Sequence, residues 1–315
     1  MMKNLTRSET AQILLAHDHY AIVTHRRPDG DTIGSSALLC MGLRQLGKNA
    51  HILENPEITP KYEALHRGLT KPRAEEGDFV VTVDVASEKM LPDWAKGLTF
   101  DLRIDHHGSA TSFTPVELVE PEAAACGETV YGVLAEMGAE LDIPMAEALY
   151  TAVSTDTGCF RDANTTENTL RTAAACKEAG ADTFAINQAL FETNSLARLQ
   201  VQSYLVQNGI FLQDGKVAVC ALPKEVEVRF GATEDDLENI SGFPRSIEGV
   251  KLAVTIREEG EHRVKMSVRA VPGCDASALC AKFGGGGHKG AAGASMNATM
   301  EEAVKAVIAQ LPTIE

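Results

Sequence analysis

Carboxylate and imidazole side chains gather in this sequence where apolar runs end, and side chains of these types can bind divalent cations. Eight of them stand out by position, namely His25, Asp29, Asp31, Asp84, Asp105, His106, His107 and Asp156. Ligand groups of open parallel sheets collect beyond the carboxyl ends of the strands, so these side chains are expected to meet at one sheet edge. Like charges at such close range repel strongly, and cations or protons must neutralise them.

The types of these side chains indicate which cation they would bind. Carboxylate and imidazole ligands without thiolates favour Mn²⁺, Mg²⁺, Fe²⁺ or Co²⁺ over a structural Zn²⁺. The set is large enough for two ions, and two ions about 3.5–4 Å apart form the usual clamp for in-line phosphoryl displacement.

Each residue also has a simpler interpretation. The run Pro28-Asp29-Gly30-Asp31 is typical of a tight turn in which Gly30 allows a positive φ, so that the two acids point in different directions. Asp84 and Asp105 could be turn residues at strand ends, and Asp156 could end a helix. These interpretations are independent of one another, whereas a single metal site explains all the residues. We therefore favour the metal site.

A glycine run, Gly284 to Gly287, precedes His288 in the C-terminal part of the chain. Backbone N–H groups free of side chains can form a concave anion site, to which His288 and Arg269 would add charge. No Gly-Lys-Ser/Thr follows, so this is not a Walker loop, and a flexible loop is the alternative. Arg245 precedes a strand and is either a further phosphate contact or an exposed loop residue.

Strands and helices alternate over the first 190 residues. Apolar runs predict strands, and helical periodicity with capping residues predicts helices. The predicted strands are 20–24, 48–54, 79–84 and 98–105, and the predicted helices are 6–16, 32–46, 60–68, 127–137, 144–155, 166–179 and 183–191. This alternation predicts an α/β fold with a parallel sheet covered by helices on both faces.

The character of the chain changes near residue 215. A polar-sided helix is predicted at 196–207, and strands then dominate at 216–220, 249–256 and 262–269 before a last helix at 299–310. We therefore predict a catalytic domain over residues 1–190, a helical linker over 191–214 and a smaller α+β domain over 215–315, with a cleft between the domains.

Composition limits the function classes. The 315 residues carry a formal net charge of −15, which disfavours long nucleic acid but leaves room for a short phosphorylated substrate. Seven scattered cysteines without a CxxC motif do not form a disulfide framework. No apolar run is long enough to span a membrane, and no signal-peptide core follows the first residues, so we expect a cytoplasmic protein. The apolar helices leave room for a homodimer.

The motifs in combination resemble those of the DHH phosphoesterase superfamily. The N-terminal part is similar through His25-x3-Asp29-Gly30-Asp31, Asp84, Asp105-His106-His107 and Ser154-Thr155-Asp156-Thr157-Gly158. The C-terminal part is similar to the DHH-associated domain through Lys265 to Arg269 and Phe283 to Gly293. The compact length resembles the nanoRNase/pAp-phosphatase branch, which hydrolyses short oligoribonucleotides and 3′-phosphoadenosine 5′-phosphate (pAp).

The resemblance implies two Mn²⁺ ions per chain, with Mg²⁺ or Co²⁺ as substitutes. One ion would be held by His25, Asp29 and Asp84, and the other by Asp31, Asp84, His106 and Asp156. It implies that a hydroxide between the ions attacks phosphorus in line. His107 would then face the substrate phosphate, and Asp105 would orient a histidine or the loop.

The resemblance also implies a nucleotide site in the C-terminal part. The residues that would hold the terminal phosphate or the base are Ser267, Arg269, Gly285, Gly286 and His288. Two departures limit the match. Gly108-Ser109-Ala110 stand where family members often carry an Asn, and Ala125-Cys126-Gly127-Glu128 stand where this branch often reads Ser-Thr-Ala-Glu.

Other activities fit parts of the pattern. A cyclic di-AMP or linear dinucleotide phosphodiesterase is the nearest alternative. A RecJ-type exonuclease is disfavoured because the chain lacks extra domains and a basic groove, and a manganese pyrophosphatase is disfavoured by the glycine-His motif. A non-catalytic nucleotide-binding protein would be expected to lack a metal ligand, and none of the motif residues is missing.

Overall fold

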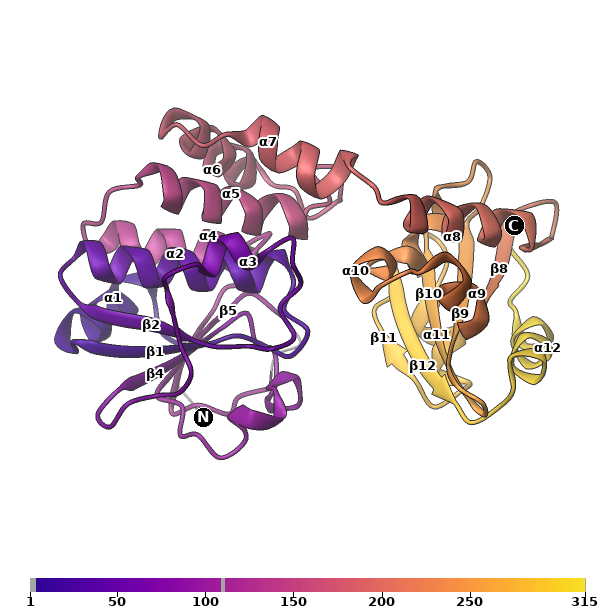
Figure 1. The fold of residues 1–315 in the computed structure, drawn as a ribbon, viewed down its shortest axis with the longest axis horizontal. Coiled ribbons are helices and arrows are strands. Elements are labelled where there is room, and N and C mark those ends of the chain that lie inside the picture. Colours follow the sequence, from indigo (N-terminus) through magenta and orange to yellow (C-terminus); the bar gives the residue numbers. More distant parts are fainter. Residues whose placement is uncertain (1–3, 109–110, 315) are drawn as a thin grey trace. The chain divides into compact units, whose positions relative to one another are not determined.

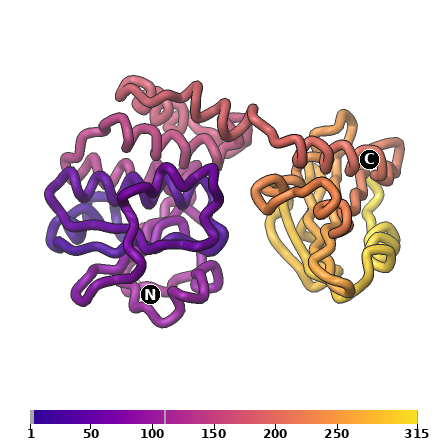
Figure 2. The backbone as a smooth tube through the Cα atoms, viewed as in Figure 1, coloured from indigo at the N-terminus to yellow at the C-terminus, as the bar shows by residue number. Residues whose placement is uncertain are grey.

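The computed structural model describes residues 4–108 and 111–314, so Ser109 and Ala110, at the first departure from the family pattern, lie outside the described residues. The chain forms two compact units, Met1–Thr193 and Asn194–Glu315, which can be followed along the chain in Figures 1 and 2. The stretch predicted as a linker contains helix α8 (Leu196–Gln207) and strand β7 (Ile210–Leu212), and both lie within the second unit.

A six-stranded parallel sheet forms the centre of the first unit and confirms the predicted α/β class. Its strands are β1 (His19–Val23), β2 (Asn49–Leu53), β3 (Thr70–Lys71), β4 (Phe79–Val83), β5 (Leu102–Asp105) and β6 (Val116–Val119). Their spatial order is β3-β2-β1-β4-β5-β6. The order reverses between β1 and β4, and ligands of such sheets bind where the order reverses, beyond the carboxyl ends of the strands.

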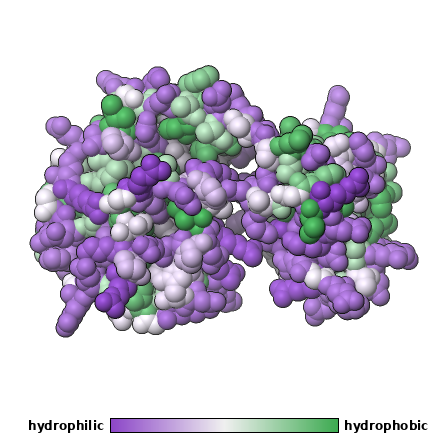
Figure 3. Space-filling view, in the orientation of Figure 1, coloured by the Kyte–Doolittle hydropathy of each residue, from purple (hydrophilic) through white to green (hydrophobic). Residues whose placement is uncertain are grey.

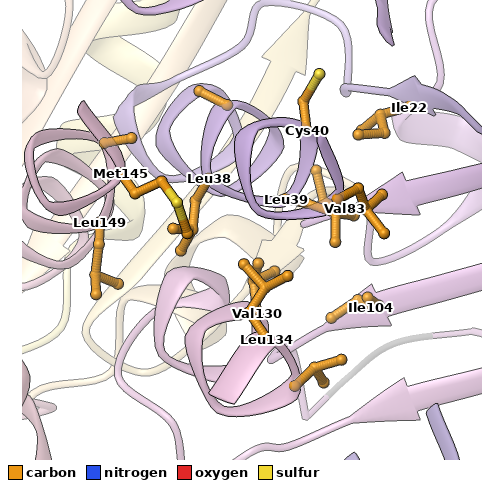
Figure 4. Packing of buried hydrophobic residues seen from close by; sticks show 14 of the residues in the cluster. Ile22, Leu38, Leu39, Cys40, Val83, Ile104, Val130, Leu134, Met145 and Leu149 are labelled. Atoms are coloured by element: carbon orange, nitrogen blue, oxygen red, sulfur yellow. The ribbon is translucent and has the colours of Figure 1, made fainter. Parts of the chain in front are cut away.

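Helices cover one face of this sheet in two layers. They are α1 (Arg7–Ala16), α2 (Gly30–Gln45), α3 (Glu63–His66), α4 (Cys126–Glu136), α5 (Ile143–Asp156), α6 (Glu167–Glu178) and α7 (Thr183–Asn187), the last continued by a π-helical turn, Gln188–Glu192. Helices α2 and α4 pack on the strands, and α5 packs over both (Figure 1). In the core shown in Figure 4, Ile22 and Val83 of the strands meet Leu39 of α2, and Val130 of α4 lies beside Ile104.

The other face of the sheet is covered without an α-helix among the described residues, in contrast to the predicted helical cover on both faces. Two short 3₁₀ turns, Glu88–Met90 and Asp93–Ala95, lie in the segment that buries Val85, Leu91 and Phe100 against this face. Strand β5 accordingly begins at Leu102, four residues later than predicted. Residues 85–101 include Pro92 and Gly97, which interrupt regular structure.

The second unit is a smaller α+β fold with a six-stranded sheet in the order β11-β12-β10-β9-β8-β7. Besides β7, its strands are β8 (Val217–Leu222), β9 (Leu252–Gly260), β10 (Arg263–Ala270), β11 (Gly286–Gly287) and β12 (Ala291–Met296). Besides α8, its helices are α9 (Lys224–Phe230), α10 (Glu234–Leu237), the 3₁₀ helix η4 (Ile240–Ser246), α11 (Ala276–Ala281) and α12 (Met300–Gln310). The glycine run, for which a flexible loop was the alternative to an anion site, partly pairs as strand β11 with β12.

The surface facing the viewer in Figure 3 is mostly hydrophilic, with small separate apolar areas. Within the described ranges, every helix is too short or too polar to cross a membrane. All seven cysteines are free thiols; five are buried, and Cys159 and Cys274 are half-buried.

Close contact between α2 and α5 depends on Gly34. A Cβ at this position would lie 2.4 Å from the carbonyl oxygen of Ala148 and 2.9 Å from the Cβ of Ala152. We expect Gly34→Ala to lower the free energy of unfolding by about 1–3 kcal/mol, because overpacking outweighs the better helix propensity of alanine. The measurement is urea unfolding followed by circular dichroism.

Gly108→Ala is the control for this substitution, because its nearest new contact is an ordinary one, 3.4 Å from Pro121. Equal unfolding free energies for the two variants would contradict the close-packing role of Gly34.

Candidate metal centre and phosphate site

The loop after β1 holds His25 in a buried position with one ring nitrogen free to bind an ion. Its Nδ1 donates a hydrogen bond to the carbonyl oxygen of Arg26 at 2.8 Å, which leaves Nε2 without that proton. Nε2 lies 3.6 Å from Asp29 Oδ1 and 3.6 Å from Asp84 Oδ2. His25, Asp29 and Asp84 therefore surround one point.

The start of helix α2 places the next two acids. Asp29 is the N-cap, and its Oδ1 accepts hydrogen bonds from the backbone N–H groups of Asp31 and Thr32, each at 3.2 Å. The expected positive φ at Gly30 is wrong, because Gly30 is the first helical residue and has no such angle. A side chain there would instead strike Thr155 at 2.4 Å, so Gly30 is required for the close approach of α2 to the end of α5.

Asp31 is buried and held by the start of a second helix. Its carboxylate accepts hydrogen bonds from the backbone N–H groups of Cys126 at 2.7 Å and Gly127 at 3.0 Å, and from Ser35 Oγ at 2.8 Å. The N-terminus of α4 thus stabilises this negative charge through its dipole and free N–H groups. Residues 126 and 127 make their contacts through backbone groups, so the departure at Cys126 removes no contact that Asp31 receives from this turn.

Asp84 lies at the centre of the cluster and immediately after β4. Its side chain is 4% exposed, and within the described part of the chain its Oδ1 has no hydrogen-bond partner. Its backbone adopts the left-handed region with φ 58°, which few non-glycine residues adopt and in which aspartate is enriched. A buried carboxylate oxygen without a partner is costly, and a bound cation would compensate it.

A second group of ligand atoms surrounds His106. Its Nδ1 donates to the carbonyl oxygen of Ala123 at 3.1 Å, which leaves Nε2 available. Nε2 lies 3.6 Å from Asp31 Oδ2, 3.5 Å from Asp84 Oδ1 and 3.5 Å from Asp156 Oδ2. Asp156 is the last residue of α5, so helices as well as strands bring ligands to the site.

The spacing of these atoms fits two cations. Separations of 3.5–3.6 Å are too long for hydrogen bonds. Ligand atoms on one ion, each about 2.1 Å from it, lie about 3–3.5 Å apart. The two groups share Asp84, which offers Oδ2 to the His25 side and Oδ1 to the His106 side. The residues present therefore fit divalent cations, and Asp84 is common to the two groups of ligand atoms.

Without cations, the cluster shifts the pKa values of its members. Burial raises the pKa of Asp84 well above its ordinary value, and the negative charge of Asp31 raises it further. Burial likewise raises the pKa of Asp156 to about 7, with Asp31 again the next cause. Burial lowers the pKa of His106, but Asp31 and Asp84 outweigh it and the net shift is upward. The raised pKa values of Asp84 and Asp156 reflect burial together with repulsion between carboxylates, and bound cations would compensate both.

His107 and Asp105 form a turn beside the cluster. Asp105 Oδ1 accepts hydrogen bonds from the backbone N–H of His106 at 2.8 Å and from His107 Nδ1 at 2.8 Å. The latter bond is the main cause that raises the pKa of His107 to about 9. Asp105 is fully buried and its carboxylate holds the ring of His107, while His107 remains partly exposed.

Arg103 is a residue of this site that sequence reasoning missed. It is 1% exposed, and its Nη2 contacts Glu117 Oε2 at 2.6 Å. Its Nη1 donates to the carbonyl oxygens of Ala86 at 3.2 Å and Thr111 at 3.1 Å. Arg103 thus ties together the two segments that follow Asp84 and His107. An arginine within an otherwise apolar strand was the signal that could have found it.

The second unit gathers the predicted nucleotide-binding residues on one part of its sheet. Ser267 and Arg269 lie on the same face of β10. Ser267 pairs with Gly293 of β12, and Gly293 pairs on its other side with Gly286 of β11. His288 lies in the turn from β11 to β12, where its N–H donates to Ala291 O at 2.8 Å. Gly285 approaches β12 so closely that a Cβ would lie 2.2 Å from Gly293 O.

Arg245 reaches the same region from helix η4, which packs on β9 and β10. Burial lowers the pKa of Arg269, and the positive charge of Arg245 lowers it further. Within the described residues, neither guanidinium has a carboxylate partner within ion-pairing distance. Two neighbouring unpaired guanidinium groups beside a glycine strand can bind an anion such as phosphate.

Comparison with protein families identifies both units. The model described as "DHH family, N-terminal domain" matches residues 19–153, and the model described as "DHHA1 domain" matches residues 214–312.

Two curated relatives and one solved structure match most of the chain. A Thermus thermophilus protein named "bifunctional oligoribonuclease and PAP phosphatase NrnA" is 33% identical over 283 residues, covering 87% of this chain and 83% of that protein. A Bacillus subtilis protein of the same name is 27% identical over 317 residues, covering 98% of each. The crystal structure of an exopolyphosphatase-related protein from Bacteroides fragilis superposes with a TM-score of 0.83 and 27% identity, covering 96% of this chain and 94% of that one.

Removal of Arg103 should destabilise the first unit. We expect Arg103→Met to lower the free energy of unfolding by about 3–5 kcal/mol, because it leaves Glu117 buried without its partner. The double variant Arg103→Met/Glu117→Gln should recover part of this loss. Arg263→Met is the control, since its ion pair with Glu259 is 64% exposed on the arginine side and should contribute less than about 1 kcal/mol. Chemical unfolding of the four proteins measures the differences.

Divalent cations should reverse the pH dependence of stability. In chelator, the raised pKa values of Asp156 (3.8 to about 7) and His107 (6.5 to about 9) mean that the folded state favours their protonated forms. Their contributions are present at low pH and are lost as pH rises through about 7 and about 9, so stability should fall between about pH 5 and 9. Bound cations require deprotonated ligands, so with Mn²⁺ stability should rise over the same range.

Thermal unfolding in chelator and in excess Mn²⁺ at several pH values tests this reversal. At an ion concentration of 100 Kd, each site should add about 2.7 kcal/mol. Asp156→Asn should flatten the acidic part of the curve in chelator. Parallel curves in chelator and Mn²⁺ would show that the cluster does not bind cations.

Proposed function

Because the chain belongs to the DHH family of phosphoesterases, we propose that it hydrolyses short oligoribonucleotides and pAp with the help of two divalent cations. The main observation behind this proposal is the position of Asp84, whose two oxygens lie 3.6 Å from His25 and 3.5 Å from His106. Two groups of ligand atoms that share one carboxylate suit phosphoryl transfer between paired ions. Their place at the reversal of strand order is where a substrate would reach them.

We assign the residues of the first unit to two tasks. One cation would be held by His25, Asp29 and Asp84, and the other by Asp31, Asp84, His106 and Asp156. When bound, the cations would activate water and neutralise charge that develops on the phosphate. The amides at the starts of α2 and α4 hold Asp29 and Asp31 in place for this role.

His107 is proposed to face the substrate phosphate. Its Nδ1 is held by Asp105, so the rest of the ring is oriented for contact with an anion. With a pKa of about 9 in the ion-free protein, the ring carries a positive charge at neutral pH and would attract phosphate. Asp105 is therefore proposed as a positioning residue for His107.

The second unit is proposed to bind the nucleotide end of the substrate. Arg269 and Arg245 would contact a terminal phosphate, and His288 with the N–H groups of Gly285 and Gly286 would complete the anion site. Ser267 lies in the same row as Gly286 and could donate a hydrogen bond.

The names of the relatives favour the two substrate classes, since both are named as oligoribonuclease and PAP phosphatase. We propose Mn²⁺ as the physiological ion, because carboxylate and imidazole ligands without thiolates suit it. Free thiols at all seven cysteines favour a reducing compartment such as the cytoplasm.

Substitution of Asp84 should remove activity without loss of the fold. Asp84→Asn keeps the shape and tolerates the left-handed backbone, but it weakens both cation sites. We expect kcat/KM for pAp and for 5′-pApA to fall by about 10³-fold or more, and the same for His106→Ala. Asp93→Asn, at a carboxylate that is 92% exposed, should change neither rate. Steady-state hydrolysis with Mn²⁺ and with Mg²⁺ measures these effects.

The same assay distinguishes the alternatives. Wild-type turnover of pAp and 5′-pApA well above that of cyclic di-AMP supports the proposal. Preferential turnover of cyclic di-AMP would favour the phosphodiesterase alternative. Full activity in Asp84→Asn or His106→Ala would contradict the assignment of these residues.

A further inference from the structure

A pocket of about 680 Å³ opens beside the metal centre within the first unit. Its floor includes Leu53, the last residue of β2, and Arg73, two residues beyond the end of β3. It therefore lies beyond the carboxyl ends of the same parallel sheet as the metal ligands, where such sheets bind ligands. Its volume falls within the range of about 300–1,000 Å³ that is usual for small-molecule sites.

A hydrogen bond joins the pocket lining to the loop that carries His25, and a second hydrogen bond joins that loop to the segment before Trp94. Asn55 lines the pocket, and its buried amide Nδ2 donates to the carbonyl oxygen of His25 at 2.8 Å. The N–H of Arg26, the residue after His25, donates to Met90 O at 2.8 Å, and Met90 precedes the lining residue Trp94 by four positions in the chain. The pocket lining thus contacts the loop of His25 through Asn55, and the segment before Trp94 contacts the same loop through Met90.

The lining combines an aromatic ring with positive charge. Trp94, the single tryptophan of the chain, is 38% exposed. Arg67 and Arg73 are exposed, and neither forms an ion pair with another described residue. His66 also lines the pocket, but burial lowers its pKa to about 4, so the positive charge comes from the two arginines.

These groups match the parts of a nucleotide. An exposed aromatic ring stacks on a base without regard to sequence, and guanidinium groups bind phosphate or stack on the base. The carboxylates of Glu54 and Glu63, on the pocket rim, can accept hydrogen bonds from ribose hydroxyls or base amino groups. Apolar side chains such as Leu53 and Leu98 complete a surface for a flat ring.

We propose that this pocket binds the second nucleoside of an oligoribonucleotide whose scissile phosphate lies at the metal centre of the same unit. The inference rests on the proposed function. It has a direct consequence for selectivity: 5′-pApA has a second nucleoside to place in the pocket, whereas pAp has none. The pocket thus sets the preference for oligonucleotides and leaves pAp hydrolysis unaffected.

The test compares both substrates in pocket variants. Trp94→Leu and the double variant Arg67→Met/Arg73→Met should each lower kcat/KM for 5′-pApA by about 10-fold or more, the size of one lost base stack. Their kcat/KM for pAp should stay within about 2-fold of wild type. Phe184→Leu, at an aromatic ring that is 68% exposed on α7, is the control and should change neither value. Equal losses for both substrates, or no loss for 5′-pApA, would overturn the proposal.

Binding can be followed without turnover, because Trp94 is the only source of tryptophan fluorescence. In the Asp84→Asn protein with Mg²⁺, 5′-pApA should quench this fluorescence and pAp should not. Absence of quenching by 5′-pApA, or equal quenching by both, would overturn the pocket assignment. Failure of the wild-type enzyme to hydrolyse either substrate would instead overturn the proposed function, so the two failures are distinguishable.

Discussion

The repulsion among buried carboxylates governs the first unit. Asp31 and Asp84 are both buried and surround the same imidazole, His106, with Asp156 on its third side. In a medium of low dielectric such charges cannot coexist without compensation. The protein supplies part of it through helix N-termini and imidazoles, and leaves one oxygen of Asp84 without a hydrogen bond. The negative charge that remains uncompensated at Asp84 is one that a bound cation would neutralise.

The sheet topology explains why the charges meet at all. Strands β1, β4 and β5 are neighbours, and each is followed by residues that could hold a metal ion. Two helices then close the site from the other side, α2 at its start and α5 at its end. Gly30 permits this approach, since any side chain would collide with Thr155. The close packing of α2 against α5 and the convergence of the candidate metal ligands thus depend on the same contact between Gly30 and Thr155.

Much of the centre was predictable because its chemistry depends on residue type and on strand ends. The parallel sheet, the convergence of the motif residues and the α+β second unit all follow from local patterns. The pocket near Trp94 was not predictable, since it depends on residues brought together only by tertiary structure. Arg103 carried a signal in the sequence, a charge within an apolar strand, but its partners became visible only in the structure. The role of Gly30 was misjudged for the same reason: the sequence shows a turn residue, whereas the constraint comes from Thr155, over a hundred residues away.

The left-handed backbone of Asp84 has an evolutionary consequence. Only glycine, asparagine and aspartate adopt that conformation readily, and of these only aspartate offers two anionic oxygens. Glutamate would retain the charge but strain the backbone, so no single substitution preserves both geometry and charge. Substitutions that keep the backbone of Asp84 unstrained are therefore easier at other residues of the cluster, for example at the half-exposed Asp29. The backbone conformation of Asp84 thus limits which residue types can occupy this position, independently of the chemistry of the side chain.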